Sequence, residues 1–264
     1  MVKRILEIST WVISALGLIA LLGFARIGHY SSPVTGLELE IVKEPEGGFL
    51  GYNQMHEEIT SLVGANRTKS LGSLKVRNLQ RQLELNPFVA HAEASTTLDR
   101  KVRVKLIERK PFVRIFTANN ESYYIDNEYV IFPTHPEFVA RVIIANGNIS
   151  PLPIPENAVL PLSHLMNKQH SAFSIARVAD EINRDDFMKV LIDQIFITEE
   201  NSIEITPKIG DASVIVGDTS NIKNKIVTIS AFFQSKSNDP ALRNYSSIDA
   251  RYRNQIVCTK RDSL

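Results

Sequence analysis

The sequence has few of the residues that build cross-linked or strongly charged proteins. It contains one cysteine, Cys258, among 264 residues, so no disulfide can form within the chain. A domain in an oxidising compartment must then be held together by packing alone. The 30 Lys and Arg side chains nearly balance the 29 Asp and Glu side chains, so no basic field exists to attract nucleic acid. These two absences exclude disulfide-stapled modules and nucleic-acid-binding domains.

Motifs of common catalytic centres are also absent from the sequence. His56 and Glu57 begin like the zinc motif H-E-x-x-H, but Thr60 stands where the second histidine is needed. Gly-x-Ser-x-Gly does not occur, and the glycines between residues 47 and 51 lack the spacing of a phosphate-binding loop. We therefore predict no catalytic residue, no metal site and no cofactor.

One long apolar run is present near the N-terminus. Residues 8–25 carry no charge, and a helix of this length rises about 27 Å, close to the thickness of a bilayer core of about 30 Å. Lys3 and Arg4 precede the run, which favours a cytoplasmic N-terminus. A cleaved signal peptide is the alternative, but its apolar run is usually shorter. We predict a cytoplasmic tail over residues 1–7, a transmembrane helix over 8–25 and a linker over 26–36.

The next part of the sequence predicts a small α+β unit over residues 37–111. Its strands alternate apolar and polar residues, and its two helices repeat apolar residues at helical spacing. Asn86-Pro87 ends the second helix, because proline disfavours helical geometry in the residue before it. We predict strands at Leu37–Val42, Val89–Thr97 and Val102–Glu108, with helices at Gln54–Val63 and Val76–Leu85 covering one face of the sheet.

Short strands separated by turn residues dominate residues 112–264. This texture predicts a mostly antiparallel β domain with flanking helices, and the fold class of the whole chain is α+β. Asp185 and Asp186 are placed to cap a short helix. The predicted strands are Val113–Phe116, Ser122–Ile125, Val130–Phe132, Phe138–Ala145, Leu191–Thr198, Ser202–Thr206, Ser213–Val216, Ser247–Tyr252 and Gln255–Thr259; helices are predicted at Ser174–Asn183 and Ile222–Phe233, and a surface loop at Asn146–Pro161.

Several local motifs, taken in order, resemble a known family. The N-P-x-V element at residues 86–89 and the E-R-x-P element at residues 108–111 are similar to the POTRA-domain pattern. The I-D-x-R-Y element at residues 248–252 is similar to the end of the β domain that follows a POTRA domain. The chain therefore resembles the bacterial cell-division family FtsQ/DivIB. It departs from the family pattern at Tyr129, where glycine is usual, and at Ala250, where leucine is common.

The resemblance implies a function in the bacterial divisome. It implies a non-catalytic, single-pass protein of the inner (plasma) membrane at the division site, with its bulk on the extracytoplasmic side. It also implies binding to the FtsB/FtsL coiled-coil pair, regulation or recruitment of the septal peptidoglycan synthase, and contact of the POTRA part with FtsK-like proteins.

The last hairpin is the predicted binding site. Residues 248–253 alternate apolar and polar side chains, and nothing in the sequence covers the strand at 255–259. An uncovered edge can accept a partner strand, which pairs through main-chain hydrogen bonds. Tyr252 is either an exposed anchor or a core tyrosine, and Lys225 either meets an acidic partner residue or is solvated. The predicted partner-binding residues are Lys225, Arg251, Tyr252, Ile256 and Val257.

Two other functions stay open from the sequence. POTRA-like modules also occur in envelope assembly and secretion factors, although this chain carries an N-terminal anchor. A membrane-tethered envelope hydrolase with a site assembled from distant residues is the second alternative. Loss of function on mutating a His, Ser or Asp in a pocket, with partner binding intact, would favour the hydrolase.

Overall fold

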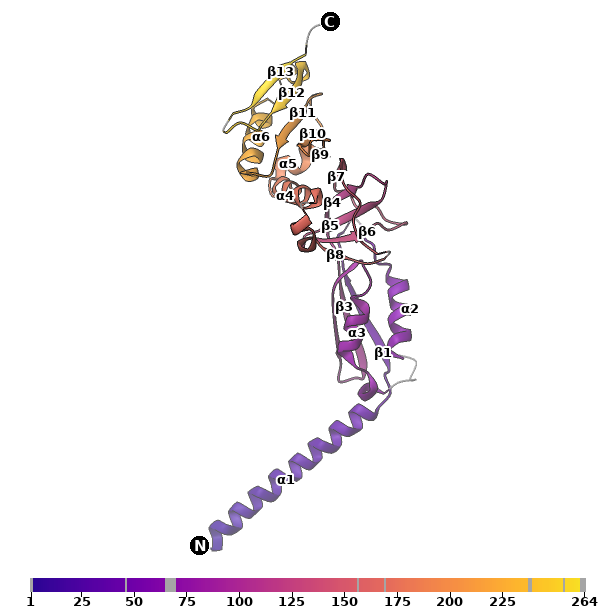
Figure 1. Ribbon diagram of the computed structural model, residues 1–264. Helices are drawn as coiled ribbons and strands as arrows, with labels where there is room; N and C mark the ends of the chain where they lie inside the picture. The colour runs from indigo at the N-terminus through magenta and orange to yellow at the C-terminus, as the bar shows by residue number, and fades with distance from the viewer. Residues whose placement is uncertain are drawn as a thin grey trace. The chain divides into compact units, whose positions relative to one another are not determined.

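A computed structural model of the chain describes residues 2–45, 47–64, 70–155, 157–168, 170–236, 239–253 and 255–261 (Figure 1). The chain divides into two compact units. The smaller unit is Met1–Lys43 with Leu50–Glu108, and the larger is Glu44–Phe49 with Arg109–Leu264. Each unit packs helices on a sheet around its own core, so the predicted α+β fold class is confirmed.

The N-terminal helix α1 runs from Val2 to Ser31 without a break (Figure 1). Its part from Ser9 to Ser31 is long and apolar enough to cross a membrane, and none of it is buried within the protein. The helix continues past the predicted end at Ala25 because no breaking residue occurs before Pro33, which disfavours helical geometry at Ser32. The first part of the predicted linker is therefore helical.

The smaller unit contains a three-stranded sheet in the order β1-β3-β2. β1 (Gly36–Val42) pairs in parallel with β3 (Lys101–Glu108), and β2 (Val89–Thr96) pairs antiparallel with β3. Helix α2 (Tyr52–Val63) packs on β1, and α3 (Val76–Leu83) packs on β2. The short helix η1 (Leu71–Ser73) precedes α3.

Strand alternation separates the two faces of this sheet. Val102, Val104 and Leu106 of β3 are buried in the core beneath the helices. The intervening side chains face away from the core and form ion pairs with β1, such as Arg103 with Glu38 at 3.0 Å. Burial of one apolar face thus fixes the register of the sheet.

The larger unit contains a ten-stranded sheet in the order β13-β12-β11-β10-β9-β7-β4-β5-β6-β8 (Figure 1). Most neighbouring strands are antiparallel, but the pairs β4–β7, β7–β9 and β11–β12 are parallel. The strands are β4 (Pro111–Phe116), β5 (Ser122–Asp126), β6 (Val130–Pro133), β7 (Ile143–Gly147), β8 (Leu160–Pro161), β9 (Ile192–Ile197), β10 (Ile203–Pro207), β11 (Ser213–Gly217), β12 (Tyr245–Asp249) and β13 (Val257–Lys260).

Helices pack on the sheet and complete the main core of this unit. α4 (Ser171–Asn183) packs on β4 and β9, and α5 (Asp186–Leu191) and α6 (Ile222–Lys236) pack beside it. Their buried apolar side chains meet those of the strands in one continuous cluster. Two short 3-10 helices, η2 (Leu162–Lys168) and η3 (Pro240–Asn244), complete the unit.

A separate aromatic cluster changes one sequence prediction. Phe49, which precedes α2, packs edge-to-face on Tyr124, Phe132 and Phe138. The hydroxyl of Tyr124 accepts a hydrogen bond from the backbone of Ala140 at 3.1 Å. These contacts hold residues 138–142 outside the sheet, so the predicted strand Phe138–Ala145 is wrong in its first half.

Candidate protein-binding site at the end of the large sheet

β13 lies at one end of the ten-stranded sheet, where the ribbon is yellow in Figure 1. It pairs antiparallel with β12, with Val257 opposite Asp249 and Cys258 opposite Ile248. Within the described residues, no strand pairs with its other side. Unpaired N–H and C=O groups along such an edge are free to bond a further strand. The sheet therefore has an open margin where the sequence predicts one.

Tyr252 lies in the turn between β12 and β13, and 53% of its surface is exposed. The predicted strand Ser247–Tyr252 is therefore wrong in its last three residues, because β12 ends at Asp249. The alternative of a core tyrosine is excluded, since core residues such as Tyr124 have no exposed surface. Val257, the first residue of β13, is also exposed. Ile256 is different because it is partly buried and packs against the main core of the unit. The margin thus offers an exposed aromatic and an exposed aliphatic side chain.

Arg251 is held in place by Asp249. Its Nη2 donates to Asp249 Oδ2 at 2.6 Å, its Nε donates to Oδ1 at 3.0 Å, and its backbone N–H also donates to Oδ1 at 3.0 Å. The hydrogen bond from Arg251 lowers the pKa of the buried Asp249 carboxyl. Gly217 leaves room for the arginine, because a Cβ there would lie 2.9 Å from Arg251 Cγ. A bidentate pair of this kind fixes a guanidinium in one orientation.

Lys225 closes the turn between β11 and α6. Its ammonium donates to the carbonyl oxygens of Val216 and Asp218 at 2.9 and 3.0 Å, and to Asp218 Oδ1 at 2.8 Å. Only 11% of the Lys225 side chain is exposed, so the prediction of a solvated lysine is wrong. Hydrogen bonding from Lys225 and then Ser220 lowers the pKa of Asp218 to about 2. The lysine is mainly a structural cation of this turn.

A groove of about 370 Å³ joins this turn to the end of β12. It brings together three of the predicted residues, Lys225, Arg251 and Tyr252, whereas Ile256 and Val257 lie outside it. Sequence reasoning missed the wall that α6 supplies. The signal for it was helical spacing, because residues three, four and seven apart share one face of a helix. The missed lining residues are Ser220, Asn221, Asn224, Thr228, Ala250 and Arg253.

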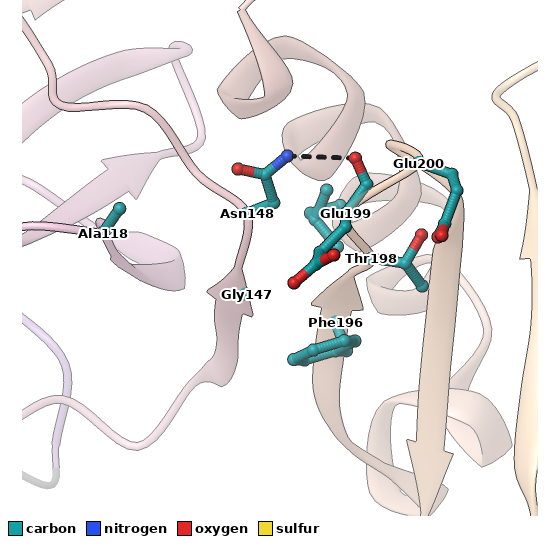
Figure 2. A pocket seen from close by; sticks show the side chains of 8 residues that line it. Ala118, Gly147, Asn148, Phe196, Thr198, Glu199 and Glu200 are labelled. Atoms are coloured by element: carbon teal, nitrogen blue, oxygen red, sulfur yellow. Dashed lines mark hydrogen bonds between the residues drawn. The ribbon is translucent and has the colours of Figure 1, made fainter.

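A second groove, of about 540 Å³, lies where β7 and β9 end (Figure 2). Figure 2 shows the Glu199 side chain above the Phe196 ring, with Asn148 Nδ2 donating to the Glu199 carbonyl at 3.3 Å. Gly147 has a φ of 101°, and a Cβ there would lie 2.1 Å from the Ile197 carbonyl oxygen. The close approach means that only glycine fits at this position of the wall. The groove has no histidine, cysteine or lysine among its lining residues, and its charged groups are the carboxylates of Glu199 and Glu200.

Metal-ligating side chains do not cluster in the described part of the chain: no group of three or more His, Cys, Asp or Glu is placed to hold an ion. Cys258 is half-buried in β13, and burial raises the pKa of its thiol. A raised pKa keeps the thiol protonated and weakly nucleophilic. The chemistry that the site supports is therefore recognition through backbone groups, an aromatic side chain and fixed cations.

A family model described as FtsQ/DivIB, C-terminal related, matches residues 110–259, more than half of the chain. The chain belongs to the FtsQ/DivIB family. The match extends from the start of the large sheet into β13, so the groove and the open margin lie within the part that defines this FtsQ/DivIB protein. A search of the curated proteins found no match.

Membership gives the protein a role in cell division and, in general terms, partners within the division machinery. FtsQ/DivIB proteins are division scaffolds. Together with the apolar helix α1, membership indicates a single-pass membrane protein.

Proposed function

We propose that this FtsQ/DivIB protein binds the FtsB/FtsL pair through β13 and the groove beside it. The observation that carries the proposal is the open side of β13 next to the exposed Tyr252. A partner strand added to β13 would gain affinity from main-chain hydrogen bonds and specificity from alternate side chains. Tyr252 would supply a large contact area at low cost in conformational entropy.

Charge supports an acidic partner segment. Arg251, Arg253 and Lys225 line the groove; Asp249 and Asp218 already balance the charges of Arg251 and Lys225, so Arg253 is the lining cation that pairs with no acidic side chain in the described part of the chain. Arg251 keeps more than half of its side chain exposed while its orientation is fixed. Complementary charge of this kind raises the association rate and disfavours wrong partners.

The proposal includes location and role. α1 anchors the protein in the inner (plasma) membrane with Lys3 and Arg4 in the cytoplasm, and the larger unit and the part of the smaller unit after α1 lie on the extracytoplasmic side at the division site. Bound there, the protein recruits or regulates septal peptidoglycan synthesis without catalysing a reaction. The smaller unit is a POTRA-like domain that contacts FtsK-like proteins.

Capture of co-expressed FtsB/FtsL by the full chain tests the binding site. Tyr252→Ala should weaken capture by about 30-fold, since truncating an anchor residue costs about 2 kcal/mol or more. Val257→Asp should also weaken it, because a partner strand would have to cover a charge on the edge.

Matched controls are available for both variants. Tyr52 is 52% exposed, close to the 53% of Tyr252, but it lies in the smaller unit, so Tyr52→Ala should leave capture unchanged. Val139 is an exposed valine away from β13, and Val139→Asp should likewise have no effect. Normal capture by folded Tyr252→Ala and Val257→Asp variants would overturn the proposed site.

A further inference from the structure

The tip of the β2–β3 hairpin lies beside the point where the chain enters the smaller unit. Thr35 donates its backbone N–H to the Arg100 carbonyl at 2.9 Å and its hydroxyl to the Asp99 carbonyl at 3.0 Å. The parallel register continues this contact, with Gly36 opposite Lys101. Thr35 follows the last residue of α1, Ser31, by four positions, which span at most about 14 Å. The hairpin tip is therefore tethered close to the end of the apolar helix.

Leu98 is presented at this tip with 95% of its surface exposed. The turn around it is ordered: Thr97 Oγ1 accepts from the Lys101 N–H at 3.1 Å, and the Arg100 N–H donates to the Thr97 carbonyl at 3.1 Å. Arg100 has a φ of 66°, a conformation that turns usually give to glycine or asparagine. A leucine held outward by a rigid turn contributes nothing to the core of the unit.

Positive charge surrounds the exposed leucine. Asp99 is neutralised by Lys101 at 3.1 Å, while the Arg100 side chain is exposed. The short helix η1, which precedes α3, lies at the same end of the unit, since the Leu71 N–H donates to the Ser32 carbonyl at 3.0 Å. Lys75 and Arg77, both exposed, begin α3. This end of the unit thus combines an apolar tip with Arg100, Lys75 and Arg77, exposed cations that form no ion pair with another described residue.

We infer that Leu98 and Arg100 contact the membrane that α1 spans, with Leu98 among the acyl chains near the surface and Arg100, Lys75 and Arg77 against anionic phospholipid headgroups. Interfacial segments bind membranes through this combination of apolar area and positive charge. The short tether makes the membrane surface the partner within reach, and it makes the contact intramolecular in effect. The inference rests on the proposed anchoring by α1. It implies that the end of the smaller unit that carries Leu98 faces the bilayer.

Leu85 provides a matched control within the same unit. It is 78% exposed but precedes β2, whereas Leu98 follows it, so the length of the strand, about 26 Å, separates the two leucines. Only Leu98 lies at the end tethered to α1. General stickiness of exposed leucines would affect both positions equally.

The test uses tryptophan fluorescence of the full chain in nanodiscs, with Trp11→Phe as the background. Leu98→Trp should show blue-shifted emission that brominated phosphatidylglycerol quenches, whereas Leu85→Trp should show neither change. Adding Arg100→Glu, or replacing the brominated phosphatidylglycerol by phosphatidylcholine brominated to the same extent, should reduce the quenching at position 98.

Co-elution of the protein with nanodiscs reports on the anchor separately. A co-eluting protein whose Leu98→Trp emission matches that of Leu85→Trp would overturn the inference alone. Quenching that is insensitive to both Arg100→Glu and lipid charge would overturn the headgroup contact. Failure to co-elute would overturn the anchor and, with it, both the inference and the proposed location.

Discussion

Individual residues around the groove act mainly through fixed ion pairs. Lys225 and Asp249 are largely buried, and each has its charge satisfied within the protein. Sequence reasoning placed Lys225 among the partner-binding residues but missed its structural role, because no pattern along the chain shows that Val216 and Asp218 place three oxygen atoms around one ammonium. Tyr252, by contrast, has its side chain exposed and can therefore contact a partner directly.

The Asp218–Lys225 pair predicts a pH dependence of stability. The pKa of Asp218 falls from 3.8 to about 2 on folding, so its contribution is complete above about pH 4 and is lost as the pH falls through about 2. Because 74% of the Asp218 side chain is exposed, the contribution should be about 1 kcal/mol or less. Urea unfolding of Asp218→Asn, followed by circular dichroism, should show this deficit at pH 7.

The deficit should narrow as the pH is lowered from about 4 toward about 2, because the wild-type carboxylate becomes protonated there. Asp193, which pairs with Lys208 at 3.3 Å, is an exposed control, and Asp193→Asn should change stability by less than about 0.5 kcal/mol. A deficit that stays constant down to about pH 2 would contradict the role assigned to the pair.

The observed limits of helices and strands agree closely with the predicted limits where an element buries only one of its faces. Strands β1, β2 and β3 and helices α2 and α3 lie within two residues of their predicted limits, because each shows a clear apolar period. The errors fall where long-range contacts decide: residues 138–142 are held by Phe49, and the parallel neighbours β4, β7 and β9 come from distant segments. The open edge at β13 was predictable because it depends on a local hairpin.

Helix α5 depends on a cap that the sequence also predicts. Asp185 accepts hydrogen bonds from the backbone N–H groups of Phe187 and Met188, both at 3.0 Å. Burial raises the pKa of Asp185, whereas hydrogen bonds from Met188, Ser230 and Phe187 lower it. The combined effect of the hydrogen bonds is the larger, so the pKa lies below its usual value. Asp185→Ala should cost about 1 kcal/mol, seen as about fivefold faster hydrogen exchange in α5.

Asp186 is the internal control for this cap. It is the first residue of α5 and contributes its charge to the first turn, without a side-chain hydrogen bond to the helix start. Asp186→Ala should therefore cost only a few tenths of a kcal/mol. Equal acceleration of exchange by the two variants would show that charge, rather than capping, stabilises the helix.

At the scale of the whole molecule, each unit has a main hydrophobic core of its own, and among the described residues no buried side chain belongs to both cores. Leu106→Ala should destabilise the smaller unit by about 2 to 5 kcal/mol, because it removes a fully buried side chain. Hydrogen exchange should accelerate in β1, β2 and β3 but stay unchanged in β9 and β10. Ile195→Ala in the larger unit should give the reverse pattern, and loss of protection in both units from either change would show that they unfold together.

Strand β7 has a consequence for the rate at which the larger unit folds. It is five residues long, yet in the sheet of the described residues it alone joins β4, β5, β6 and β8 to the strands from β9 to β13. Both of its pairings are parallel, so each needs a long connection to close, whereas the hairpins on either side form between neighbouring segments. Closing such connections is slow compared with hairpin formation. Docking of β7 should therefore be the late, rate-limiting event of folding. Until it occurs, the edges of β4 and β9 that face β7 stay unpaired and can associate with other chains.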